Sequence, residues 1–385
     1  MKDKVIFGAG ELGCKAIRKY GANEILTVID NDQRKIGTIF EGFTVISLAE
    51  FLKSWKGNEN IVICATWKHT EEISKQLLSQ GIDNFSVFSF QLFEDVDLLF
   101  NQYETFEGIS EQVWNNKIIE GEDRKLVRKF VNENMTEVPL FHEIEIETIN
   151  RCNGGCSFCP VNVQNDIRTE KLMDENLFYK IINELKEIRY AGRIALFSNN
   201  EPLLDKRIVV FSRYVRENLP NAQIHLFTNG TLLSIDLFAK LIPYLDELII
   251  DNYNQQLELI PTVKAIKEYI ESMENDLLRK KVKILLRKPN EILSSRGGDA
   301  PNRNTIIDVH SETCALPYCQ MVVRPSGKVS LCCNDPYGKM TLGDLNEEHI
   351  LDIWYGDKYK QVREMLSGGR GMLEHCKNCD TFMII

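Results

Sequence analysis

The sequence predicts an α/β protein with two parallel sheets, followed by a smaller extension. Two stretches, residues 1–95 and 141–310, alternate short apolar strands with amphipathic helical segments. This alternation is typical of parallel strands joined by right-handed crossovers. After them, two apolar runs flank Pro325-Ser326-Gly327, which indicates a hairpin. Residues 96–140 between the sheets are charged and helical in pattern, and we interpret them as a helical connector.

The composition is that of an ordinary soluble globular protein. Of the 385 residues, 43% are hydrophobic and 26% are charged, and the net charge of -10 argues against nucleic-acid binding. No apolar run is long enough to cross a bilayer, and the first residues do not resemble a signal peptide. We therefore expect a cytoplasmic protein without membrane or nucleic-acid partners. Its 11 cysteines then point to metal ligation and free thiols.

The first sheet begins with a glycine turn. A short strand from Val5 leads into Gly8, Gly10 and Gly13, which allow a tight turn and close approach to a phosphate. The next strand, 25–29, ends in Asp30, where a ribose-binding carboxylate belongs. Together with strands at 60–64 and 85–88, this predicts a small Rossmann-like, doubly wound domain. A bound nucleotide or nucleotide-sugar and a docking module with a vestigial glycine turn remain equally open.

The second sheet carries polar residues where its strands end. We expect strands at 143–147, 194–197, 224–227, 248–250, 282–286 and 305–309. In barrels of parallel strands, chemistry sits at the carboxyl ends of the strands. That edge is therefore the predicted site of the active centre.

Three cysteines form the most informative motif. Cys152, Cys156 and Cys159 have the spacing C-x3-C-x2-C directly after a strand of period two. Three thiolates can hold three corners of a cubane iron-sulfur cluster, which leaves one iron open for a small molecule. A zinc site completed by histidine, or a disulfide scaffold, is the alternative. The position of the loop, between a strand and a helical segment, favours the cluster.

This motif resembles that of the radical S-adenosylmethionine (SAM) superfamily, including the aromatic Phe158 before the third cysteine. The resemblance implies a partial (β/α)6 barrel and a [4Fe-4S] cluster whose open iron is chelated by SAM. The family usually has Gly-Gly-Glu-Pro at the second strand end, whereas this chain has Asn199, Asn200, Glu201 and Pro202. The resemblance also implies that further residues contact SAM at this edge, namely Asn200, Glu201, Thr228 and Asn229.

Two charged residues at strand ends are candidate catalytic groups. Glu147 shares one face of the first strand with Glu143 and Glu145, so it either points into the barrel lumen near substrate or pairs with a barrel arginine. Arg287 follows the fifth strand, where its planar fork could bind the SAM carboxylate or a substrate anion. A solvated strand end is the equally weighted alternative for Arg287.

The tail contains a second cysteine set. Its cysteines could supply four thiolates from Cys314, Cys332, Cys376 and Cys379. Cys319 and Cys333 are then left over. Because adjacent cysteines rarely both ligate one metal, one of Cys332 and Cys333 is spare, and the spacing does not decide which. The pattern resembles the twitch extension, the short relative of the SPASM domain, which carries an auxiliary [4Fe-4S] cluster. A zinc ribbon is the alternative, although its ligands normally come as two C-x2-C pairs and here there is one.

These observations predict a radical SAM oxidoreductase. Four cysteines would saturate the auxiliary cluster, which suits it to accept an electron during oxidation of a sugar, cyclitol or nucleotide-linked small molecule. A peptide-modifying maturase is the alternative enzyme, and a zinc-binding scaffold is the alternative outside enzymes. A flavodoxin- or ferredoxin-type protein is the expected electron donor. The expected domains are 1–95 Rossmann-like, 96–140 connector, 141–310 barrel and 311–385 auxiliary-cluster extension.

Overall fold

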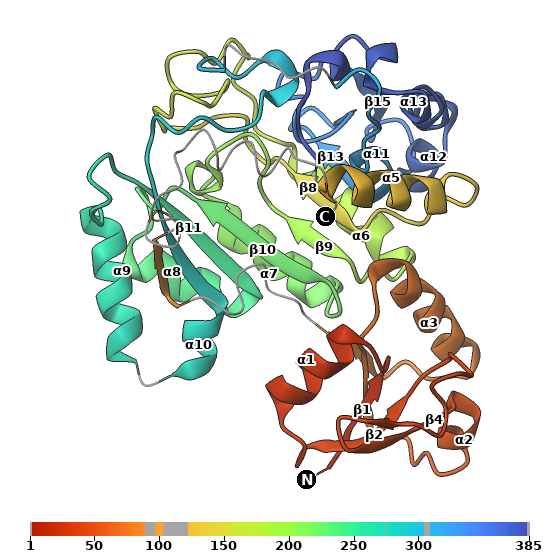
Figure 1. Ribbon diagram of the computed structural model, residues 1–385. Coiled ribbons are helices and arrows are strands. Elements are labelled where there is room, and N and C mark those ends of the chain that lie inside the picture. Colours follow the sequence, from red (N-terminus) through yellow and green to blue (C-terminus); the bar gives the residue numbers. More distant parts are fainter. Residues whose placement is uncertain are drawn as a thin grey trace. The chain divides into compact units, whose positions relative to one another are not determined.

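The structure, a computed structural model, describes residues 2–88, 97–101, 103, 122–273, 275–303 and 309–382. It divides into two compact units, Met1–Leu92 and Phe93–Ile385, and each is described by itself (Figure 1). None of the helices within these described ranges is both long and apolar enough to span a bilayer.

The first unit is a six-stranded sheet in the order β3-β4-β2-β1-β5-β6. Side chains of β1 alternate between two cores, with Val5 and Phe7 in one and Ile6 in the other, so both faces are covered. This confirms the predicted doubly wound sheet and adds an unpredicted β3-β4 hairpin. The elements are β1 Lys4–Phe7, α1 Glu11–Tyr20, β2 Ile25–Ile29, β3 Ile39–Phe40, β4 Phe43–Ile46, α2 Leu48–Leu52, β5 Asn60–Ile63, α3 Trp67–Ser79 and β6 Phe85–Val87.

The second unit is built on a nine-stranded sheet in the order β15-β14-β13-β8-β9-β10-β11-β12-β7. Strands from β13 to β7 pair in parallel, and β9, β10 and β11 lie side by side in Figure 1. The strands are β7 Leu99–Asn101, β8 Glu143–Ile146, β9 Arg193–Ala195, β10 Gln223–Thr228, β11 Glu247–Tyr253, β12 Val282–Arg287, β13 Gln320–Val323, β14 Lys328–Ser330 and β15 Thr341–Asp344. The helices are α5 Glu122–Asn134, α6 Glu175–Glu187, α7 Ile208–Asn218, α8 Ile235–Leu241, α9 Pro261–Ser272, α10 Asp276–Lys281, α11 Leu316–Cys319, α12 Ile350–Trp354 and α13 Asp357–Ser367.

The five central strands confirm the predicted positions to within a few residues. The sixth predicted strand, 305–309, lies outside the described residues except for Val309. The described neighbour of β12 is instead β7, which comes from the predicted helical connector. The prediction is therefore wrong at 99–101, where a run of three residues is too short to show a strand pattern. α5 is helical, as predicted.

The register of β8 determines which side chains face the barrel lumen. Ile144 and Ile146 belong to the main core, together with Phe178 and Ile181 of α6. Because side chains alternate along a strand, Glu143 and Glu145 point to the opposite side, and both are buried. The predicted hairpin is also present: β13 and β14 pair in antiparallel fashion, and Gly327 between them has a φ of 84°, which favours glycine.

Candidate active site

The predicted cluster loop follows β8 at the carboxyl edge of the sheet. Gly154 lies between two of its thiols: a Cβ at this position would lie 3.3 Å from Cys152 Sγ and 3.9 Å from Cys156 Sγ. Its backbone N–H donates to Cys152 Sγ at 3.3 Å. The absence of a side chain here leaves the two sulfurs facing a common space.

An asparagine that sequence reasoning did not single out holds the loop. Asn162 Nδ2 donates to the carbonyls of Cys156 and Cys159, at 2.9 and 2.8 Å. A further bond runs from the Ser157 N–H to the carbonyl of Pro289, at 2.8 Å. The loop is thus fixed internally and to the segment after β12. Local side-chain bonding of this kind is common for asparagine, but the residue type alone gives no signal for it.

Of the three loop cysteines, Cys156 is buried and Cys152 and Cys159 are half-buried, and their thiols lie close enough to influence one another. Burial raises the pKa of Cys152 to about 11 and that of Cys156 to about 12, and neighbouring thiols of the same loop contribute. A thiolate is the form that binds metal. Three clustered thiols in a low-dielectric setting suit a cationic iron cluster, which would stabilise their ionised form. Among the described residues, no three His, Cys, Asp or Glu side chains are placed to hold a single metal ion.

The predicted SAM-binding residues converge on one buried carboxylate. Glu201 accepts from Thr228 Oγ1 and from the backbone N–H of Asn229, both at 2.8 Å. Asn229 Nδ2 then reaches Asn153 Oδ1 in the cysteine loop at 2.8 Å. Beside them, Asn200 Nδ2 is buried without a hydrogen-bond partner among the described residues. These side chains, which come from three strand ends, therefore gather around the cysteine loop, and Asn200 keeps a free donor.

Replacing Glu201 tests this arrangement. Its carboxylate also accepts from the N–H of Leu203 at 3.0 Å, so Glu201→Ala leaves three donors unsatisfied. We expect the free energy of unfolding to fall by about 2–4 kcal/mol, measured by urea denaturation. Glu217→Ala, at a site 63% exposed, is the control and should change stability by less than about 0.5 kcal/mol. Equal effects of the two substitutions would contradict this role.

Glu147 pairs with an arginine, which was one of the two predicted possibilities. Its Oε1 lies 3.0 Å from Arg168 Nη1. Arg168 also pairs with Asp166 at 3.0 Å and donates to the carbonyls of Asn150 and Asn199. Burial raises the pKa of Glu147 to about 7, and the Arg168 charge opposes that rise. Sequence reasoning missed Arg168, which lies on an irregular segment far from any strand end.

Arg287 is not a solvated strand end. Its Nε donates to Glu291 Oε2 at 2.9 Å, and its Nη1 lies 3.4 Å from Asp251 Oδ1. The guanidinium also lies 5.7 Å from the Tyr253 ring, which in turn contacts Phe158 of the cysteine loop at 5.9 Å between centroids. Arg287 therefore stabilises a buried network beside the loop, and in this structure both of its ion-pair partners belong to the chain itself.

A second network joins the barrel lumen to the extension. Glu145 accepts from Ser198 Oγ and from Gln320 Nε2, the latter at 2.8 Å, and Gln320 Oε1 accepts from the Cys333 N–H at 3.1 Å. Asn199, which departs from the family's glycine, donates to the Cys333 carbonyl at 3.0 Å and accepts from Arg296. Asparagine at this position thus ties the second strand end to the extension, a bond that glycine cannot make.

The lumen carboxyl predicts a pH effect. Burial, with help from Glu143, raises the pKa of Glu145 from 4.5 to about 8. Between these values the folded state binds more protons than the unfolded state, so the contribution of Glu145 to stability falls as pH rises. Between pH 5 and pH 8.5, we expect the free energy of unfolding of Glu145→Gln to rise by roughly 3 kcal/mol relative to that of the wild type, measured by thermal unfolding at each pH. A pH-independent difference between the two proteins would contradict this.

The second cysteine set lines one small cavity, of about 10 Å³. Cys314, Cys332, Cys376 and Cys379 face it together with Arg370 and His375. Cys333 has different surroundings. Burial and the lumen carboxylates Glu145 and Glu143 raise the pKa of its thiol, whereas Arg296 lowers it. Cys319 Sγ contacts the Ala315 carbonyl at 3.4 Å. Four of the six thiols therefore converge on one cavity, and Cys332, not the adjacent Cys333, is one of these four. Four thiols around one space suit a saturated cubane cluster.

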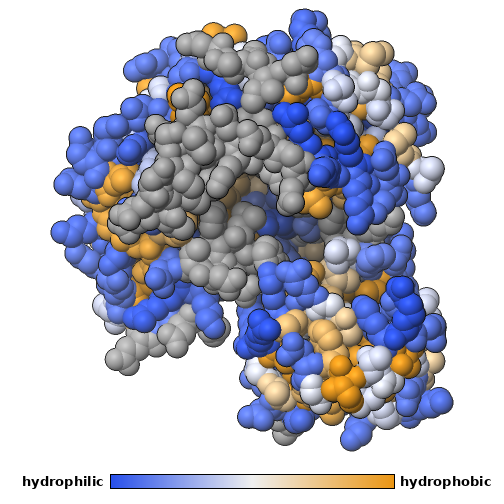
Figure 2. Space-filling view, viewed as in Figure 1, coloured by the Kyte–Doolittle hydropathy of each residue, from blue (hydrophilic) through white to orange (hydrophobic). Residues whose placement is uncertain are grey.

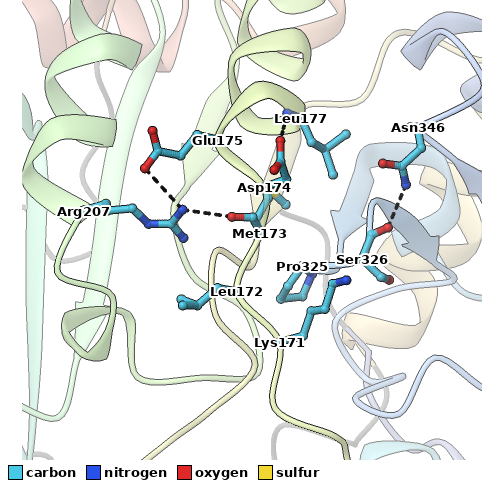
Figure 3. A pocket seen from close by; sticks show the side chains of 10 residues that line it. All are labelled: Lys171, Leu172, Met173, Asp174, Glu175, Leu177, Arg207, Pro325, Ser326 and Asn346. Atoms are coloured by element: carbon cyan, nitrogen blue, oxygen red, sulfur yellow. Dashed lines mark hydrogen bonds and ion pairs between the residues drawn. The ribbon is translucent and has the colours of Figure 1, made fainter.

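Two cavities lie where the barrel rim meets the hairpin. One, of about 310 Å³, is lined by Glu147, Arg168 and Arg324. The other, of about 500 Å³, lies next to it, and both include Lys171, Pro325 and Ser326. Figure 3 shows Lys171 beside the hairpin turn, with Arg207 on the opposite wall. Much of the coloured surface in Figure 2 is hydrophilic.

The glycine turn of the first unit opens onto a cavity of about 570 Å³, lined in part by Gly8, Gly10 and Asp30. Gly13, in α1, is not among the lining residues of this cavity. A Cβ at Gly13 would lie 2.0 Å from the Gly8 carbonyl oxygen, so glycine is needed for α1 to pack this closely on the end of β1. Asp30 accepts from the N–H groups of Ala9 and Asp32 and from Lys35. Burial acts to raise the pKa of Asp30, but these partners lower it below its usual value. The predicted ribose ligand thus also closes the turn.

A three-cysteine loop at the carboxyl edge of a parallel sheet, followed by four converging buried cysteines, defines a class of iron-sulfur enzyme. Family comparisons agree with this class. Residues 146–258 match the radical SAM superfamily, and residues 314–380 match SPASM, an iron-sulfur cluster-binding domain. Residues 1–88 match the family C2185-like, N-terminal.

The chain is 31% identical over 249 residues to the S-adenosyl-L-methionine-dependent 2-deoxy-scyllo-inosamine dehydrogenase of Niallia circulans, covering 64% of this chain and 95% of that one. Among solved structures it is similar to BtrN in complex with AdoMet and 2-DOIA, with 30% identity, a TM-score of 0.52, and coverage of 62% of this chain and 93% of that chain. BtrN in an open conformation gives 28% identity and a TM-score of 0.47, over 62% and 92% of the two chains. The chain belongs to the radical SAM superfamily.

Membership confirms several predictions. The chain is a radical SAM oxidoreductase with a barrel, a SPASM-type extension and two kinds of [4Fe-4S] cluster, one of which binds SAM. The matched SPASM model describes an iron-sulfur cluster-binding domain, which favours iron-sulfur over the zinc alternative in the extension. The residues that hold each cluster, and the substrate, follow below as proposals.

Proposed function

We propose that this chain oxidises a secondary alcohol of a sugar, cyclitol or nucleotide-linked small molecule to a ketone. The observation that carries the proposal is the set of four thiols around one cavity. Four thiolates complete the ligands of a cubane cluster, so that cluster suits electron acceptance rather than substrate binding. The similar dehydrogenase, whose name gives an aminocyclitol substrate, supports the same direction of reaction.

We propose that Cys152, Cys156 and Cys159 hold the SAM-binding cluster. When bound, this cluster and SAM supply a 5′-deoxyadenosyl radical that takes hydrogen from an unactivated carbon. Around this loop the side chains proposed to contact SAM are Phe158, Asn200, Glu201, Thr228 and Asn229. The auxiliary cluster is assigned to Cys314, Cys332, Cys376 and Cys379.

The lumen residues then have distinct roles. Glu145 is the proposed acceptor of the substrate hydroxyl proton, because it is buried in the lumen and its pKa of about 8 suits proton transfer near neutral pH. Glu147 and Arg287, both held in ion pairs, act by positioning the strand ends rather than by binding a free anion. Loss of one hydrogen atom, one proton and one electron turns the alcohol into the ketone.

Anaerobic incubation with SAM and dithionite tests the proposal. Candidate substrates are 2-deoxy-scyllo-inosamine, a panel of UDP-sugars and a short peptide. We expect 5′-deoxyadenosine together with a cyclitol or sugar product that has lost two hydrogens, detected by mass spectrometry. Modification of the peptide alone would support the maturase alternative, and no product from any of them would overturn the substrate class.

We further propose that the first unit binds a nucleotide or nucleotide-sugar in its cavity. The cavity lies at the carboxyl ends of β1, β2 and β5, where ligands of open α/β sheets bind. A Cβ at Gly10 would meet no atom within 4 Å, so Gly10→Val adds bulk at the turn without a clash. Calorimetry of the whole chain with NAD and UDP-sugars should show binding that Gly10→Val weakens. No binding of either would favour the docking module.

The remaining partner is an electron donor. Reduction of the SAM-binding cluster needs a low-potential donor, so we propose a flavodoxin- or ferredoxin-type protein. Thiol-ligated clusters require reducing surroundings, which supports a cytoplasmic location.

A further inference from the structure

Arg370 is a buried arginine at the auxiliary cysteine set. Its side chain lines the same cavity as Cys314, Cys332, Cys376 and Cys379, and the residue is only 1% exposed. Arginine is almost never fully buried unless it is paired. Its burial at this place therefore needs a physical reason.

Backbone carbonyls hold the guanidinium in place. Nε donates to the Thr313 carbonyl at 3.1 Å, Nη1 donates to the Cys379 carbonyl at 2.7 Å, and Nη2 donates to the Thr381 carbonyl. The preceding Gly369 has a φ of 110°, and a Cβ there would lie 2.3 Å from the His310 carbonyl. The turn and the carbonyls together fix the positive charge beside two of the cysteines.

The cavity that Arg370 lines offers sulfur from four cysteines as its candidate counter-charge. No carboxylate in the described part of the chain forms an ion pair with Arg370. A buried cation needs an anion nearby, and four ligating thiolates would supply it.

We propose that Arg370 raises the reduction potential of the auxiliary cluster, and thereby makes it the electron acceptor of the reaction. The potential of such a cluster depends on its charge, the hydrogen bonds around it and its exposure to solvent. Reduction adds one negative charge, which a fixed cation stabilises most strongly where the dielectric constant is low. The inference rests on the proposed function, since it assumes an auxiliary cluster at these four cysteines.

Arg363 provides a matched control in the same unit. It is 5% exposed and donates to the carbonyls of Pro317 and Trp354, both at 2.9 Å. Its neighbours are aromatic, with Trp354 at 4.3 Å and Tyr359 at 4.7 Å from the guanidinium to the ring centre. Arg363 is thus also a buried cation, but aromatic rings rather than thiols lie next to its guanidinium.

The test is a redox titration of the fully loaded enzyme followed by electron paramagnetic resonance, with iron and sulfide counted in every variant. We expect Arg370→Met to make reduction of the auxiliary cluster about tenfold less favourable, which for one electron is a fall of about 59 mV. Arg370→Lys keeps the charge and should stay near the wild type. Arg363→Met should shift the potential of the auxiliary cluster by less than half as much. None of the three substitutions should change the reduction potential of the SAM-binding cluster.

The possible results separate the inference from the proposed function. An unchanged potential in Arg370→Met overturns the inference and leaves the proposed function intact, whereas a wild type without a second cluster overturns the proposed function itself. If Arg370→Met does not load, Arg370→Gln is the second neutral variant. Loss of the cluster in both neutral variants, with retention in Arg370→Lys, supports a role for the charge. Loss in Arg370→Lys as well shows that only the shape of arginine matters, and this overturns the inference.

Discussion

Replacing Cys332 with serine is expected to remove the auxiliary cluster, whereas replacing the adjacent Cys333 should leave it in place. The reason is that Cys332 lines the cavity of the four thiols and Cys333 does not, while the carboxylates Glu145 and Glu143 of the lumen raise the pKa of the Cys333 thiol. Cys332→Ser should therefore lose one cluster's complement of iron and sulfide and with it the oxidation of substrate. Iron and sulfide analysis of the reconstituted proteins measures the first effect, and product analysis measures the second.

The adjacent pair is its own control, because both side chains are buried or nearly so and the substitution is the same. A loss of iron in Cys333→Ser, with retention in Cys332→Ser, would contradict the assignment. Since the Cys333 N–H donates to the Gln320 side chain and the Cys333 carbonyl accepts from the Asn199 side chain, its main chain and not its thiol has the structural role. Cys333→Ser should accordingly fold as the wild type does.

Replacing Cys156 with alanine is expected to abolish SAM cleavage while the auxiliary cluster remains. Cys156 is the most buried thiol of the loop, and its carbonyl is fixed by Asn162. Without its thiolate, the SAM-binding cluster would keep only two protein ligands. We expect formation of 5′-deoxyadenosine to fall to the level seen without protein, measured by liquid chromatography after anaerobic incubation with SAM and dithionite.

Cys14→Ala, in the first unit, is the control for this prediction and should cleave SAM at the wild-type rate. Full cleavage by Cys156→Ala would remove the proposed ligand from the site. Loss of iron from both clusters in this variant would instead show that the two cysteine sets are not independent.

Strand periodicity predicted much of the fold because the strands of parallel sheets are apolar and end in polar residues. The strand at 25–29 was predicted to the residue, and β8, β10, β11 and β12 to within three residues at either end. The edge strand β7 and the β3-β4 hairpin were missed, since strands of two to four residues show little or no period. The finer division of the second unit at residues 140 and 310 remains a prediction.

The cysteine motifs predicted the site because thiols at fixed spacing have few other uses. The long-range partners were beyond the sequence. Arg168 reaches Glu147 across 21 positions, and Gln320 reaches Glu145 across 175, so neither pair shows a local pattern. Arg370 was missed for the same reason: only folding brings its guanidinium to Cys314.

The most direct test of two clusters with different ligand sets is electron paramagnetic resonance of the reduced, reconstituted protein, recorded with and without SAM. Three cysteines leave one iron open and four leave none, so SAM should change the signal of one cluster and not that of the other. Removing Cys156 should eliminate the SAM-sensitive signal, and removing Cys332 should eliminate the other. A single signal, or two signals that both respond to SAM, would contradict the assignment of these seven cysteines.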